Sequence, residues 1–265
     1  MPLHSGLLKT LNLVTYIIAV ATFVFHDEIL QNAYENLPNY LTGNSIGLII
    51  RATYWVLLGG FILTQWLDFA HDVVVDAIDW NFFASNLVMT SWVFTWKYEW
   101  YILGQILLII NTILITRLYL KMRVFTATNL LEYAVIYVSF SLYAGMVWFD
   151  AFQNFFAAFT NKEGGPMSWA AIGAACAVFF LLVVGNYYAE YSKDPDSWAA
   201  ATITLTILSI SLYQGSKVPV VQITGYVSVG WLVGALIRRV LKNINMWHER
   251  SLDDVTVDER RGLLG

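Results

Sequence analysis

The sequence predicts an all-α protein, a polytopic bundle of transmembrane helices. Three features point to this class: 58% of the 265 residues are hydrophobic, only 13% are charged, and long apolar runs recur without any strand pattern between them. Soluble domains usually carry about 25% charged residues, so a water-exposed fold would not bury this much apolar surface. The 11 Trp and 15 Tyr also suit the aromatic belts that membrane proteins place at the lipid–water boundary.

Eight segments are candidates for spanning helices, on the rule that a span needs about 20 mostly apolar residues. They cover residues 7–25, 47–69, 82–96, 101–120, 130–159, 169–188, 198–213 and 218–241. We expect the first to be a spanning helix and not a cleaved leader, because no small-residue cleavage site follows it. The third and seventh are the shortest, and the tight turn at residues 97–99 predicts an antiparallel hairpin between the third and fourth.

The Lys and Arg residues predict that both termini lie on the cytoplasmic side of the membrane. With eight spans, only Arg51, Lys97, Lys162 and Lys217 of the 15 Lys and Arg residues fall on the opposite side. One cytoplasmic segment, "DFAHDVVVDAIDW", departs from this bias with four Asp residues and no base, and we expect it to be a loop. The polar stretch over residues 242–265 is predicted to be a solvated cytosolic tail.

Several function classes find no support in the residues. The net charge is −4 and no basic stripe exists, which argues against a nucleic-acid partner. No two of the four His residues stand at helical i, i+4 spacing, so we expect no metal site. No Ser-His-Asp set, phosphate loop or pair of carboxylates predicts a catalytic centre, so we expect no enzyme. The single Cys176 lies in an apolar run and is expected to be a small buried residue.

Aromatic residues recur in an ordered pattern through the middle of the chain. Trp92 and Trp96 are four residues apart and therefore share one helix face. The block "SFSLYAGMVWFDAFQN" carries Tyr143, Gly145 and Asn154. With "YWVLLGGFILTQW" earlier and "SWAAATITLTILSISLYQ" later, these blocks resemble the TspO/MBR-related tryptophan-rich sensory proteins in their long, eight-helix form. The resemblance covers about residues 40–234.

The resemblance implies both a fold and a function. The fold is a five-helix TspO-like core, here residues 1–160, followed by about three more transmembrane helices over residues 161–241. The function is the binding of an apolar, lipid or tetrapyrrole ligand, with porphyrin, haem or bound lipid as the candidate groups. Carried over residue by residue, the resemblance implies an aromatic pocket lined by Tyr54, Trp92, Trp96, Tyr143, Gly145 and Asn154.

The chain departs from the family pattern at the positions that surround this pocket. Ser139 replaces a Pro, Met146 replaces a Trp, and Asp150 falls where a small residue is usual. Ile50 stands where the second helix has another Trp, and Thr42-Gly43-Asn44 replaces a Pro-Ala-Gly loop. Two Trp residues of the family pocket are therefore missing here.

Arg51 and Asp150 are charged residues inside predicted spans, where an ionised group costs about 2.5–3.5 kcal/mol and usually faces a partner or a cavity. At 1.5 Å per residue, they lie roughly 9 and 13 Å below the outer ends of their helices. We predict an ion pair between them that closes part of the pocket. The alternative is that each side chain reaches water independently.

Two functions remain open at this point. The first is non-catalytic ligand binding in the aromatic pocket, which the retained Trp92, Trp96 and Tyr143 favour. The second is an accessory structural subunit of a larger membrane complex with the pocket closed, which Arg51 and Asp150 favour. A transporter or channel finds less support, because few polar residues lie within the spans. The expected partners are membrane lipid and, for the second function, other membrane subunits or a second copy of the chain.

Overall fold

The computed structural model describes residues 2–26, 39–159, 168–192 and 194–262, and all regular structure in these ranges is helical. The prediction of an all-α bundle is therefore confirmed. The long helices are α1 (Pro2–Phe25), α3 (Ser45–Thr64), α4 (Asp79–Lys97), α5 (Tyr101–Met122), α7 (Ser139–Phe159), α8 (Trp169–Asn186), α9 (Ser197–Gln214) and α10 (Pro219–Gly262). Short helical turns extend several of them: η1 (Asp68–Ala70), η2 (Val73–Ile78), α6 (Leu130–Glu132), η3 (Tyr133–Val138), η4 (Tyr187–Tyr191) and η5 (Gly215–Lys217).

Six helices in these described ranges are long and apolar enough to cross a membrane. The chain is therefore a multi-pass integral membrane protein. Helices α4 and α9, which correspond to the two shortest predicted spans, are outside this group of six. Helix α9 packs against α3, α7, α8 and α10, so its hydroxyl-bearing side chains, such as Thr202 and Ser209, are buried against protein. This position explains how a less apolar helix is accommodated in the bundle.

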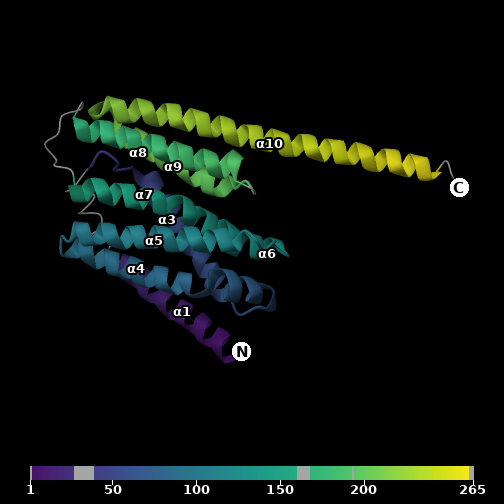
Figure 1. Ribbon diagram of the computed structural model, residues 1–265, viewed down its shortest axis with the longest axis horizontal. Helices are drawn as coiled ribbons and strands as arrows, with labels where there is room; N and C mark the ends of the chain where they lie inside the picture. Colours follow the sequence, from purple (N-terminus) through teal and green to yellow (C-terminus); the bar gives the residue numbers. More distant parts are fainter. Residues whose placement is uncertain (1, 27–38, 160–167, 193, 263–265) are drawn as a thin grey trace.

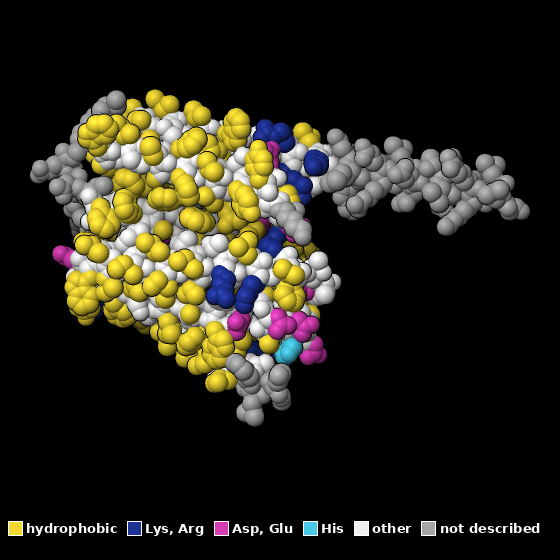
Figure 2. Space-filling model, in the orientation of Figure 1, with side chains coloured by type: hydrophobic (Ala, Val, Ile, Leu, Met, Phe, Trp, Pro, Cys, Tyr) yellow, Lys and Arg dark blue, Asp and Glu magenta, His cyan; other side chains and the backbone are white. Residues whose placement is uncertain are grey.

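The helices lie side by side along the long axis of the molecule (Figure 1). Helices α1, α4 and α5 form one side, α3 and α7 lie in the middle, and α8, α9 and α10 form the other side. Both termini are at the same end of the bundle, and α10 continues beyond it. Basic side chains gather toward this end in Figure 2, whereas hydrophobic side chains cover the rest of the visible face.

The acidic segment after α3 is largely helical, which corrects the prediction that it forms a loop. A 3-10 turn over Asp68–Ala70 is followed by a π-helical turn, Val73–Ile78, which continues directly into α4. The apolar side chains of this π turn face the core, while Asp72 and Asp76 are exposed. The apolar residues of this segment recur at helical spacing. The Asp residues between them led to the prediction of a loop.

The hairpin between α4 and α5 has a turn of three residues, Tyr98, Glu99 and Trp100. Glu99 adopts a positive φ of 59°, and the amide of Trp100 donates a hydrogen bond to the carbonyl of Thr95 at 2.8 Å. The turn reverses the chain as predicted. It brings the aromatic residues at the end of α4 against the beginning of α5, where Trp96 packs edge-on against Tyr101 with 5.3 Å between ring centroids.

Cys176 is exposed on the surface of α8, which corrects the prediction of a buried residue. Its neighbours along the same surface, Ile172 and Phe180, are also exposed. An outward apolar stripe on a spanning helix faces lipid and not water. A small apolar side chain is compatible with either the protein core or lipid, so the sequence run alone could not distinguish them.

Candidate functional site

The centre of the predicted pocket is occupied by two stacked tyrosine rings. Tyr54 of α3 and Tyr143 of α7 lie parallel, with ring centroids 4.9 Å apart and an interplanar angle of 9°, and both are completely buried. The hydroxyl of Tyr143 lies 3.0 Å from Ser85 Oγ and accepts a hydrogen bond from Asn111 Nδ2 at 3.2 Å. The two predicted ligand-binding residues are therefore each other's packing partners.

Asn154 joins the two predicted tryptophans into a single hydrogen-bonded cluster. The indole N–H groups of Trp92 and Trp96 both donate to Asn154 Oδ1, at 3.1 and 2.9 Å. Asn154 Nδ2 donates to Gln105 Oε1 at 3.0 Å and to the carbonyl of Tyr101 at 3.2 Å. The amide thus connects α4, α5 and α7. In this arrangement it orients the tryptophans and presents its polar atoms to protein groups.

Gly145 lies where α7 and α9 are in close contact. A Cβ atom added at this glycine would lie 2.8 Å from the carbonyl oxygen of Ala199 and 2.9 Å from Thr202 Cβ. Only glycine allows the two helices to approach this closely without a shift of one of them. The structure therefore places Gly145 at a helix crossing, whereas the resemblance implied a position near the ligand.

The two charged residues of the predicted spans meet in the core. Arg51 Nη2 of α3 donates to Asp150 Oδ1 of α7, and the side chains are only 11% and 2% exposed. Pairing offsets the penalty of burying each charge separately, although it does not by itself add stability relative to an apolar pair. The pair connects the two helices whose tyrosines also stack.

A cavity of about 470 Å³ lies beside this ion pair. It is bounded by the segment that leads into α3, by the first turns of α3, by one face of α7 and by the end of α9. Its described lining residues are Thr42, Gly43, Asn44, Ser45, Gly47, Leu48, Arg51, Met146, Phe149, Gln153 and Tyr213. The six predicted ligand-binding residues are not among them. Four positions at which the chain departs from the family pattern do line the cavity: Met146 and the loop residues Thr42, Gly43 and Asn44.

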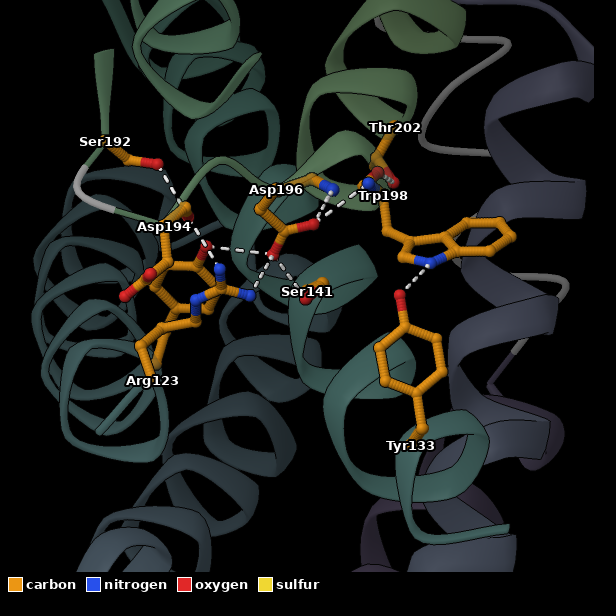
Figure 3. Close-up of polar contacts among 10 residues, drawn as sticks. Arg123, Tyr133, Ser141, Ser192, Asp194, Asp196, Trp198 and Thr202 are labelled. Atoms are coloured by element: carbon orange, nitrogen blue, oxygen red, sulfur yellow. Dashed lines mark hydrogen bonds and ion pairs between the residues drawn. The ribbon is translucent and has the colours of Figure 1, made fainter. Parts of the chain in front are cut away.

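A polar cluster around Asp196 was not identified from the sequence (Figure 3). Asp196 is 3% exposed, and its Oδ2 accepts hydrogen bonds from the hydroxyls of Tyr119 at 2.8 Å and Ser141 at 2.5 Å. Its Oδ1 accepts from the amides of Trp198 at 2.9 Å and Ala199 at 3.2 Å. The carboxylate thus caps the beginning of α9 and holds it to α5 and α7.

Arg123 supplies the positive charge of this cluster. Its Nη1 lies 3.8 Å from Asp196 Oδ2, and its Nη2 donates to the carbonyl of Asp194 at 2.6 Å. The Asp196 carboxylate thus accepts four hydrogen bonds and lies beside a guanidinium, contacts that connect α5, α7 and α9. The signal that could have identified it is the Asp just before an apolar helical run, which is typical of a helix N-cap.

No group of three or more His, Cys, Asp or Glu residues in the described part of the chain could hold a metal ion. The charged clusters that the structure does contain are pairs or caps between helices.

The helical bundle, its apolar spans and its aromatic core define a polytopic membrane protein. In a comparison with protein families, the model for the TSPO-like protein family matches residues 6–238. The chain therefore belongs to the TSPO-like family, and the resemblance inferred from the aromatic blocks is confirmed. Comparisons with curated proteins and with solved structures found no match.

Proposed function

We propose that this TSPO-like membrane protein is a non-catalytic binding protein for a compact, mainly apolar ligand, held in the cavity between α3, α7 and α9. The cavity itself is the observation that carries the proposal. Its volume of about 470 Å³ falls within the range of about 300–1,000 Å³ that is typical of small-molecule pockets.

The lining residues favour a ligand with little charge. Leu48, Met146 and Phe149 supply apolar walls, and Gln153 supplies an amide for orientation. The charge of Arg51 is balanced by Asp150, so the wall offers little attraction for an anion. A flat tetrapyrrole is less well supported, because the aromatic side chains expected to enclose it pack against one another.

The test is to fill the cavity and follow the bound molecule. The protein is purified in a mild detergent and its co-purifying small molecules are identified by native mass spectrometry. Met146→Trp should abolish the bound species, because an indole at this position occupies the cavity. Leu63→Trp is the matched control, because Leu63 is 75% exposed on α3 and does not line the cavity. A bound species that persists equally in Met146→Trp would overturn the proposal.

The second candidate, an accessory subunit of a larger membrane assembly, is favoured by the buried Arg51–Asp150 pair beside a filled aromatic core. The two candidate functions differ in what should co-purify with the protein: a small molecule or other subunits. After gentle extraction from the native membrane, migration only within a much larger complex on a native gel, without a bound small molecule, supports the subunit. A Soret band that disappears on replacement of Trp92 would instead support a tetrapyrrole ligand.

A further inference from the structure

A groove runs along the side of the bundle between α5 and α8, away from the cavity beside Arg51. It consists of two adjoining hollows of about 650 and about 440 Å³. Thr112, Ile113 and Trp148 line both hollows, which therefore lie next to each other. Helix α7 contributes Trp148 and Phe152 to the groove, and α8 contributes Phe180.

The larger hollow is almost entirely apolar. Phe180 packs against Trp148 and Phe152, with ring centroids 5.8 and 5.4 Å apart, and Phe155 and Ile109 continue the lining. Phe155, Phe180 and Ile109 are exposed at the surface, and on a membrane-spanning bundle such a surface is in contact with lipid. This part of the groove therefore suits a hydrocarbon chain.

The smaller hollow ends in two basic residues, Arg117 and Lys121. Lys121 Nζ lies 3.7 Å from Asp79 Oδ2, whereas no ion pair of Arg117 occurs among the described residues. Along α5, the rise from Ile109 to Lys121 is about 18 Å. This length is close to one leaflet of a hydrocarbon core that is about 30 Å thick.

We infer that this groove binds one anionic glycerophospholipid, with an acyl chain in the apolar hollow and the phosphate group at Arg117 and Lys121. We infer an anionic lipid because the positive groups lie at one end of an apolar groove that is about as long as one leaflet is thick. They also lie at the end of the bundle that the Lys and Arg bias assigns to the cytoplasm, where anionic lipids are enriched. The inference is independent of the proposed function, which concerns the other cavity.

The phosphate contact is tested by titrating the full chain in mild detergent with dioleoyl phosphatidylglycerol and dioleoyl phosphatidylcholine, using native mass spectrometry to count bound lipid. The wild type should prefer the anionic lipid. Arg117→Gln should weaken its binding about fivefold, and the double change with Lys121→Gln roughly 25-fold, since each basic residue near the surface contributes about 1 kcal/mol. Lys242→Gln, an exposed charge on α10, should leave the affinity unchanged.

The acyl contact is tested with Gly173→Leu, which adds a side chain inside the apolar hollow. A Cβ at Gly173 would meet Phe156 at an ordinary 3.7 Å, so the fold is retained while the hollow is filled. This variant should reduce binding of both lipids, whereas Gly230→Leu, at a position with nothing within 4 Å, should not. Equal affinity of the wild type for the two lipids would overturn the inference, as would unchanged binding in either the charge variants or Gly173→Leu.

Discussion

Arg51 and Asp150 form a buried ion pair in the described core. Each charge alone would cost about 2.5–3.5 kcal/mol within the membrane, and the two meet between α3 and α7. Their pairing was predictable because ionised residues are rare in apolar spans and usually lie near a partner. The hydrogen bonds of Asn154 were not predictable, because they depend on how α4, α5 and α7 are rotated relative to one another.

Exchanging the charges of Arg51 and Asp150 should show whether the two side chains form an ion pair or are stabilised independently of each other. Arg51→Asp or Asp150→Arg alone places two like charges in the core and should lower the free energy of unfolding by about 3–5 kcal/mol. The double exchange should recover most of this loss, as measured by denaturation in detergent.

The apolar double variant Arg51→Leu with Asp150→Leu is the control for burial, and its stability should be close to that of the wild type. The pairing would be refuted by a double exchange that is no more stable than the weaker single variant.

At the scale of whole elements, α9 determines how the C-terminal helices join the core. It packs on α3 and α7 as well as on α8 and α10, and Ser209 Oγ donates to Asn44 Oδ1 at 2.8 Å just before α3. The sequence predicted the existence of α9 but not that it contacts both the core helices α3 and α7 and the C-terminal helices α8 and α10. Its Thr and Ser residues lower the apolar signal of the helix, and only the packed structure shows that these side chains face protein.

Gly145→Ala should weaken the contact between α7 and α9. The new Cβ would lie 2.8 Å from the carbonyl oxygen of Ala199, and a backbone atom cannot rotate away as a side chain can. Overpacking of this kind costs about 1–3 kcal/mol, measurable as a lower melting temperature in detergent. Gly230→Ala on α10, where nothing lies within 4 Å, should show no such loss, and equal melting of the two variants would contradict the close contact.

For the molecule as a whole, the basic residues of the described chain are unevenly distributed between the two ends of the bundle. Lys9, Arg117, Lys121 and Arg123 belong to the end where the termini lie, and Lys97 belongs to the hairpin at the opposite end. This asymmetry could be predicted from the sequence, because the prediction requires only the limits of the spans and the positions of Lys and Arg. The sequence could not predict the lateral order of the helices, which follows from side-chain packing.

The orientation in the membrane can be measured with single-cysteine reporters. In a Cys176→Ala background, Tyr98→Cys in the α4–α5 turn should react with an impermeant maleimide added to sealed right-side-out vesicles. Thr126→Cys, in the segment after α5, should react only after permeabilisation, because the positive end is retained in the cytoplasm. The reverse labelling pattern, or reaction of both sites in sealed vesicles, would show a different topology.

The Asp196 cluster has a consequence for the order in which the protein is assembled. Asp196 is separated from Tyr119 by 77 residues and from Ser141 by 55, so the ribosome adds both hydroxyl residues well before their shared acceptor. At about 5–20 residues per second, the interval from Tyr119 to Asp196 is roughly 4–15 seconds. During this time the hydroxyl groups of Tyr119 and Ser141 lack the carboxylate of Asp196, which has yet to be synthesised. The core can therefore reach its final packing only late in translation, when α9 is delivered to the membrane.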